Sequence, residues 1–104
     1  MSLIVQKYGG TSVGSVERIE AVAEKVAACR ASGDDIVVVV SAMSGETNRL
    51  LGLADAITDT PAPREIDVLV STGEQVTIAL LSMALNKIGC EARSYTGAQV
   101  KILT

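Results

Sequence analysis

Three glycines within six residues are the first feature of this sequence that could do chemistry. Residues 9–14 read Gly-Gly-Thr-Ser-Val-Gly and lie between an expected strand and an expected helix. Free N–H groups and the positive end of a helix dipole at such a junction favour an anion such as phosphate. The pattern is neither a P-loop nor a G-x-G-x-x-G fingerprint, because Gly14 is followed by serine and the first two glycines are adjacent. The alternative is an ordinary tight turn without a ligand.

Lys7 precedes this loop, at the expected carboxyl end of the first strand. Open α/β sheets bind ligands at that edge, and a lysine there can reach phosphate oxygens as a compact positive charge. The alternative is a lysine that is simply solvated at a strand end.

Two further polar segments carry candidate side chains. Residues 41–48 read Ser-Ala-Met-Ser-Gly-Glu-Thr-Asn and follow an apolar strand, so we expect them at the same edge as Lys7. Residues 71–74 read Ser-Thr-Gly-Glu, and the Glu74 carboxylate could hold a substrate ammonium. Both segments have structural alternatives, because Thr47 can cap a helix and residues 71–74 match a capping box.

A strand, a helix and a second strand must position these residues. Residues 3–8 predict the first strand, and a helix is expected to start at Ser15 and to end at Gly33. Residues 36–40 are apolar throughout, which is typical of a central parallel strand with helices above and below it. The first third of the chain therefore predicts a βαβ unit of the α/β class.

The remaining elements are predicted from the same kinds of pattern. We expect a helix at 47–57, a loop at 59–63, a helix at 64–87 with a kink near Gly73, and strands at 92–96 and 100–103. The strand at 100–103 is expected to be left as an open edge of the sheet.

Composition excludes several functions. The 104 residues are 48% hydrophobic and carry a net charge of −3 without a basic cluster, so disorder and nucleic-acid binding are not expected. The absence of histidine excludes a catalytic triad and a His-ligated metal site made by this chain alone. Cys29 and Cys90 lie in no C-x-x-C pattern and are expected to be buried small side chains. We find no signal peptide or membrane span and expect a cytoplasmic protein.

Taken together, the motif segments resemble the opening of an aspartate kinase. The resemblance rests on residues 5–14, 38–48 and 69–75, and it extends over essentially the whole chain, including residues 94–97. It implies an amino-acid kinase (carbamate kinase-like) fold, which is a three-layer α/β/α sandwich around a mainly parallel sheet. Residues 1–104 would be the N-terminal portion of that domain, with the regulatory domains absent from this chain.

The same resemblance implies an activity. An aspartate kinase transfers the γ-phosphoryl of ATP, with Mg²⁺, to the side-chain carboxylate of L-aspartate, giving 4-phospho-L-aspartate for lysine, threonine and methionine biosynthesis. Carried over by motif position, Lys7 would be catalytic and would bind phosphate together with Gly9, Gly10, Thr11 and Ser12. Ser41, Thr47 and Glu74 would hold aspartate. No residue is expected to bind a metal directly, and the intact protein is expected to be a homo-oligomer without a nucleic-acid or membrane partner.

Two alternatives stay open on sequence grounds. Another member of the superfamily, acting on acetylglutamate, glutamate or a nucleoside monophosphate, would share the glycine loop and Lys7. Alternatively, the chain is a non-catalytic fragment that needs a partner chain. Because the family's contacts to the nucleotide base and ribose come from later sequence, we expect the chain to be an incomplete fragment with little or no activity alone.

Overall fold

The computed structural model describes residues 2–95 and 97–103, which form three helices and four strands. In chain order the elements are β1 (Leu3–Tyr8), α1 (Val16–Ala31), β2 (Asp35–Val40), α2 (Glu46–Ile57), α3 (Pro63–Lys87), β3 (Ala92–Tyr95) and β4 (Gln99–Ile102). The predicted α/β class and the predicted order of elements are confirmed. Of the expected strand at 92–96, Thr96 lies outside the described residues.

The strand order of the sheet is β1-β2-β4-β3. β2 is central and parallel to β1, as predicted, whereas β4 runs antiparallel to both β2 and β3. In this part of the sheet one pairing is therefore parallel and two are antiparallel. The expectation that the last strand forms an open edge is wrong, because β4 inserts between β2 and β3 and leaves β1 and β3 at the edges.

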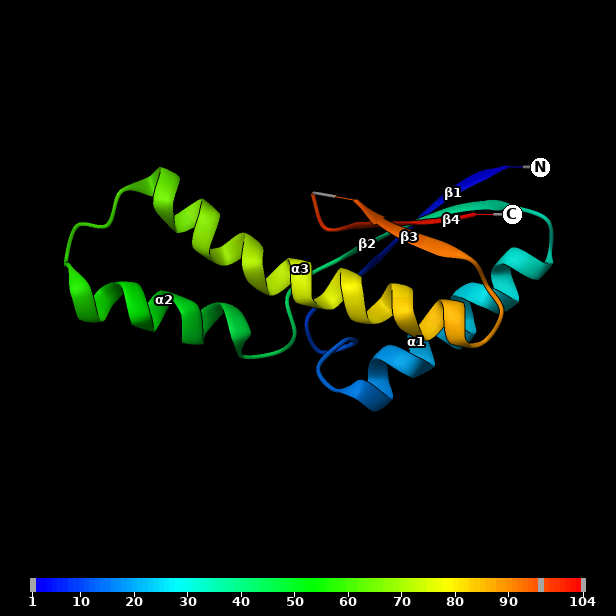
Figure 1. Ribbon diagram of the computed structural model, residues 1–104, viewed down its shortest axis with the longest axis horizontal. Helices are drawn as coiled ribbons and strands as arrows, with labels where there is room; N and C mark the ends of the chain where they lie inside the picture. Colours follow the sequence, from blue (N-terminus) through cyan, green and yellow to red (C-terminus); the bar gives the residue numbers. More distant parts are fainter. Residues whose placement is uncertain (1, 96, 104) are drawn as a thin grey trace.

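Helices of the described residues cover only one face of this sheet (Figure 1). On β2, Ile36, Val38 and Val40 are buried by the helices, whereas the alternate valines are only half-buried. On β1, Leu3 and Val5 remain 68% and 63% exposed. The expected helix layer on the second face is thus not formed by these residues, and this part of the fold has two layers. We call Leu3, Val5, Val37 and Val39, which lie on the uncovered side, the open face.

The hydrophobic core lies between the covered face and the helices α1 and α3. Ile19, Val22 and Val26 of α1 recur at helical spacing and are at most 4% exposed. Leu81 and Leu85 of α3 are fully buried in the same cluster. Both cysteines are free thiols packed partly buried against this cluster, in agreement with the expected structural role.

The helices α2 and α3 form an arm that makes the molecule elongated, with extents of 50 × 24 × 17 Å (Figure 1). α3 continues through Gly73, so both pieces of the expected helix belong to one element. By length and composition, α3 is the one helix of the described residues that could cross a membrane. α3 packs against α1, α2 and the sheet, so its apolar residues are explained by its place as a core helix.

Local signals fix the ends of two helices as predicted. The Ser15 hydroxyl accepts a hydrogen bond from the amide of Arg18 at 3.2 Å and caps α1. Gly33 and Gly89 follow the C-caps of α1 and α3 with φ of +94° and +83°, a conformation that glycine adopts without steric cost.

Candidate functional site

The glycine loop and the segment after β2 begin side by side. The amide of Ser41 donates a hydrogen bond to the carbonyl oxygen of Tyr8 at 3.2 Å, which continues the parallel pairing past the ends of both strands. Residues 9–14 and 41–45 therefore leave the sheet at the same edge. This is the edge at which open α/β sheets bind ligands.

Helix α3 brings the third motif to the same place. A methyl group on Gly73 would lie 3.0 Å from Cβ of Ala42 and 3.3 Å from Cγ of Glu46, so the backbone of α3 rests directly on the segment after β2. A methyl group on Gly10 would lie 3.1 Å from the carbonyl oxygen of Ala42. The three motif segments that the sequence analysis singled out thus meet around Ala42.

The glycine loop folds into consecutive tight turns. The amide of Ser12 donates to the Gly9 carbonyl at 3.1 Å, and the amide of Val13 donates to the Gly10 carbonyl at 3.3 Å. The amides of Gly9, Gly10 and Thr11 have no backbone acceptor among the described residues outside the strand pairings. These amides can bind an anion, whereas Ser12 has only its hydroxyl left for that purpose.

Arg18 of α1 contacts this loop, and the sequence analysis did not single it out. Its guanidinium Nη1 donates to the carbonyl oxygen of Thr11 at 3.0 Å and thereby ties the loop to α1. A cation in the first turn of a helix is electrostatically unfavourable, so its place there is a signal that sequence inspection could have used.

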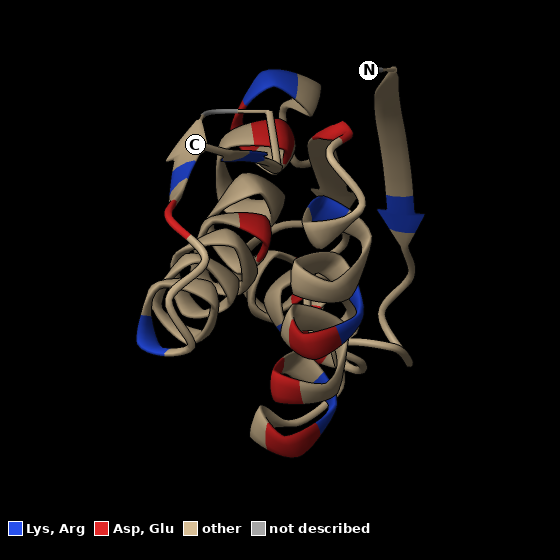
Figure 2. Cartoon of the chain, turned by 90° about the vertical axis from the view of Figure 1, so that its right-hand side faces the viewer, with Lys and Arg blue, Asp and Glu red and all other residues tan. Residues whose placement is uncertain are grey.

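Lys7 lies on the uncovered side of the sheet, beside Val39 and one residue before the end of β1. Its side chain is exposed, and it forms no ion pair within residues 2–95 and 97–103. Lys7 is the one cation of β1, and this strand is visible beside the N-terminus in Figure 2. Charges of both signs are interspersed over the helices in the same view.

The structure removes one competing explanation for Thr47. α2 begins at Glu46 after Gly45, which takes the N-cap position with φ of +83° and makes no side-chain cap. The predicted N-cap at Thr47 is therefore wrong, because a left-handed turn at Gly45 starts the helix earlier. Thr47 lies half-buried in the first turn of α2.

The capping-box alternative for Glu74 is wrong for a similar reason. Ser71 lies inside α3, and its hydroxyl donates to the carbonyl oxygen of Val68 at 2.7 Å. No helix begins there, so Glu74 has no N-terminal amide to accept from. The side chains of Ser41, Thr47 and Glu74 form no hydrogen bond with any described residue and are half-buried.

An ion pair borders the segment after β2. Arg49 Nη2 contacts Glu46 Oε1 at 2.6 Å, and Arg49 Nε donates to Glu46 Oε2 at 3.1 Å. The hydrogen bonds from Arg49 hold the pKa of the Glu46 carboxyl below its usual value. Glu46 therefore stays ionised near neutral pH with its charge already compensated by Arg49.

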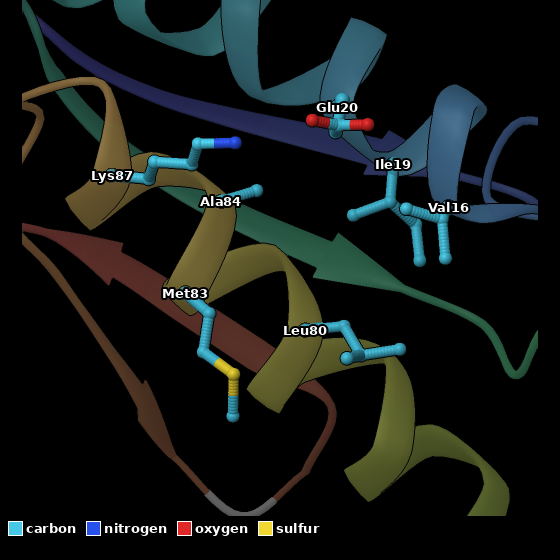
Figure 3. Close-up of a pocket in the computed structure, with 7 residues that line it drawn as sticks. All are labelled: Val16, Ile19, Glu20, Leu80, Met83, Ala84 and Lys87. Atoms are coloured by element: carbon cyan, nitrogen blue, oxygen red, sulfur yellow. The ribbon is translucent and has the colours of Figure 1, made fainter.

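A groove between α1 and α3 is separate from these segments (Figure 3). Ile19, Leu80 and Met83 supply apolar walls, with Glu20 and Lys87 at the margin. It contains none of the candidate site residues. The described residues also contain no group of three acidic or cysteine side chains that could hold a metal ion.

Comparison with known proteins identifies the family. The sequence profile of the Amino acid kinase family matches residues 2–102. The chain belongs to this family. Its fold over the described residues is also that of an aspartate kinase from Synechocystis, whose crystal structure superposes with a TM-score of 0.88 at 56% identity. That match covers 89% of this chain and 16% of the Synechocystis chain.

Relatives within the amino acid kinase family confirm the resemblance to aspartate kinases. The chain is 75% identical over all 104 residues to the aspartokinase of Pseudomonas aeruginosa and 58% identical to aspartokinase 2 of Bacillus subtilis. It spans 25% and 26% of the length of these relatives.

Proposed function

We propose that the intact protein containing this chain is an aspartate kinase. It transfers the γ-phosphoryl of ATP to the side-chain carboxylate of L-aspartate, giving 4-phospho-L-aspartate for lysine, threonine and methionine biosynthesis. The observation that supports this most strongly is the meeting of the glycine loop, the segment after β2 and the Gly73 turn of α3 around Ala42. Identity of 75% to a named aspartokinase supports the choice of substrate.

The residues of the glycine loop fit a phosphoryl group. The amides of Gly9, Gly10 and Thr11 lack backbone acceptors among the described residues, and Lys7 stands exposed near them in sequence. Their role is to bind the phosphoryl oxygens and to stabilise charge as transfer proceeds, and each well-aimed donor is worth about 3 kcal/mol in a transition state. Mg²⁺ neutralises phosphate charge when it is bound with ATP.

The proposed aspartate-binding residues are Ser41, Thr47 and Glu74. Glu74 pairs with the substrate ammonium, which a simple dicarboxylic acid lacks, and the two hydroxyls of Ser41 and Thr47 donate to a carboxylate. The attacking carboxylate is ionised near neutral pH, so the reaction requires no general base from the protein. A site without histidine is therefore sufficient.

The proposal extends to the setting of the enzyme. We place it in the cytoplasm as a homo-oligomer that acts on small molecules, without a nucleic-acid or membrane partner. Because contacts to the nucleotide base belong to later sequence in this family, the 104-residue chain by itself is expected to have little or no kinase activity.

The test is acyl-phosphate formation by the intact protein. With ATP and Mg²⁺, trapping with hydroxylamine is expected to yield a hydroxamate from aspartate and none from glutamate or N-acetylglutamate. A product from either of the latter two without one from aspartate would assign the protein to another activity of the superfamily. Substantial activity of the 104-residue chain alone would contradict the expectation that this chain by itself has little or no kinase activity.

A further inference from the structure

The segment from Ala42 to Ser44 is held between two backbones. On one side, a methyl group on Gly10 would lie 3.1 Å from the carbonyl oxygen of Ala42 and 3.6 Å from Cα of Ser44. A methyl group on Gly14 would lie 3.3 Å from Cβ of Ser44. Ala42 itself is only 5% exposed. The glycine loop is therefore in direct backbone contact with the segment after β2.

On the other side, α3 approaches the same segment at Gly73. A methyl group on Gly73 would lie 3.0 Å from Cβ of Ala42, which is closer than a Cβ atom normally comes to another heavy atom. Gly52, another glycine inside a helix, would place a methyl group with nothing within 4 Å. Gly52 and Gly73 both lie inside helices, but only Gly73 has neighbouring atoms that a methyl group would contact.

We propose that Gly73 is a positioning residue, which sets the distance between the aspartate-binding side chains and the glycine loop through its contact with Ala42. This inference rests on the proposed function and deepens it. Glu74 follows Gly73 on α3, and Ser41 precedes Ala42, so one contact fixes two of the three proposed aspartate ligands relative to each other.

If a side chain is added at Gly73, α3 is the element that can move to make room for it. Ala42 has little room to move toward Gly10, because the two backbones are so close that a methyl group on Gly10 would lie 3.1 Å from the carbonyl oxygen of Ala42. The Ser41 amide is in addition tied to the Tyr8 carbonyl at 3.2 Å. A methyl group on Gly73 therefore displaces α3, and Glu74 moves away while the glycine loop keeps its place. Interiors are packed too densely to absorb such a shift elsewhere.

The experiment compares Gly73→Ala with Gly52→Ala in the intact protein. We expect Gly73→Ala to lower kcat/KM for aspartate about tenfold to a hundredfold, because small misplacements of reacting groups have effects of that size. The KM for ATP should stay within about twofold. Gly52→Ala gains the same helix propensity without the contact and should leave both constants unchanged. Equal kinetics for the two variants would overturn the proposal.

A second substitution tests the named contact. Ala42→Gly removes the nearest of the atoms that a Gly73 methyl group would meet and leaves the flexible side chains of Glu46 and Leu50, at 3.3 and 3.4 Å, to adjust. Gly73→Ala with Ala42→Gly should therefore regain most of the lost kcat/KM for aspartate. If Gly73→Ala alone does not fold, recovery of folding by the double variant, measured as a Tm, supports the contact, and failure to recover refutes it. If the parent protein makes no aspartyl phosphate, the proposed function fails, whereas rescue of the Tm by Ala42→Gly still decides whether the contact exists.

Discussion

At the scale of single residues, Glu74 is the side chain on which we propose that substrate choice depends. It is half-buried, and the structure shows no hydrogen bond from it to any described residue, so its carboxylate is available to an ammonium. We expect Glu74→Gln in the intact protein to raise the KM for aspartate at least about tenfold, because a hydrogen bond to a charged group is lost. The KM for ATP should change little.

Steady-state kinetics with a matched variant check this expectation. Glu65→Gln alters an exposed carboxylate in the first turn of the same helix and should leave both constants as they are. A Glu74→Gln variant with the parent KM for aspartate would remove Glu74 from the substrate site.

Cys90 provides a pH-dependent test of the local packing. Burial raises the pKa of its thiol above the ordinary value of a cysteine, and the nearby charge of Arg30 partly offsets this. A raised pKa means less thiolate at neutral pH, so the midpoint of the rise in alkylation by iodoacetamide should lie at a higher pH than that of a free cysteine. Arg30→Ala should move the midpoint higher still, because a charge that favours the thiolate is lost.

Mass spectrometry of the Cys90 peptide in the intact protein measures this rate across pH. A midpoint at or below that of a free cysteine, or a midpoint that falls in Arg30→Ala, would show that Cys90 is not in the environment that the structure describes.

The sequence was enough to select candidate side chains, but it did not show the contacts that hold the candidate segments in place. Thr47 and Glu74 are recognisable from motifs. Arg18 stands out in the sequence only as a cation in the first turn of a helix, and its bond to the Thr11 carbonyl depends on how the loop turns back onto α1. The close approach at Gly73 is equally hidden, since it requires the position of Ala42 on another segment.

At the scale of elements, the N-terminus of α1 connects the glycine loop to the core. The Ser15 hydroxyl accepts from the Arg18 amide at 3.2 Å. Ser15→Ala should destabilise this end of the helix by about 1 kcal/mol. Hydrogen exchange of the first turn of α1 in the intact protein should accelerate accordingly.

Ser32→Ala is the matched control for this prediction. Ser32 is the C-cap of α1, where its backbone amide, rather than its side chain, makes the capping bonds. Exchange in the first turn should be unaffected by this change. Equal exchange rates for Ser15→Ala and the parent protein would mean that the cap contributes nothing there.

The order of the elements could be predicted, whereas the cap that starts α2 could not. Apolar spacing in α1 and the apolar run at residues 36–40 of β2 are local signals, so they identified their elements directly. The N-cap considered at Thr47 and the capping-box alternative for residues 71–74 were wrong, because motif matching does not see the left-handed turn at Gly45 or the continuation of α3. Strand order was also out of reach, since the antiparallel return of β4 depends on pairing across the sheet.

At the scale of the whole molecule, the open face governs how the chain behaves alone. Leu3 and Val5 are largely exposed beside the half-buried valines of β2. Contiguous apolar surface of this kind promotes association. The purified 104-residue chain should therefore show an apparent mass that rises with concentration, and Leu3→Lys with Val5→Lys should shift it toward the monomer.

Light scattering after gel filtration measures this shift. Ala21→Lys places the same charge on the exposed side of α1 and should leave the association unchanged. A monomeric parent chain at high concentration would contradict the prediction. The apolar character of β2 predicts helices on both faces of the sheet, whereas the described residues supply a helix layer on one face only.

The central claim is that the glycine loop and Lys7 handle a transferring phosphoryl group, and Lys7→Ala in the intact protein tests it most directly. The measurement is kcat for aspartyl hydroxamate formation at saturating ATP and aspartate, with the exposed Lys25→Ala of α1 as the control. We predict a loss of about a hundredfold or more for Lys7→Ala, the size expected for one donor to a developing charge, and none for Lys25→Ala. A Lys7→Ala variant with the kcat of the parent protein would contradict the account.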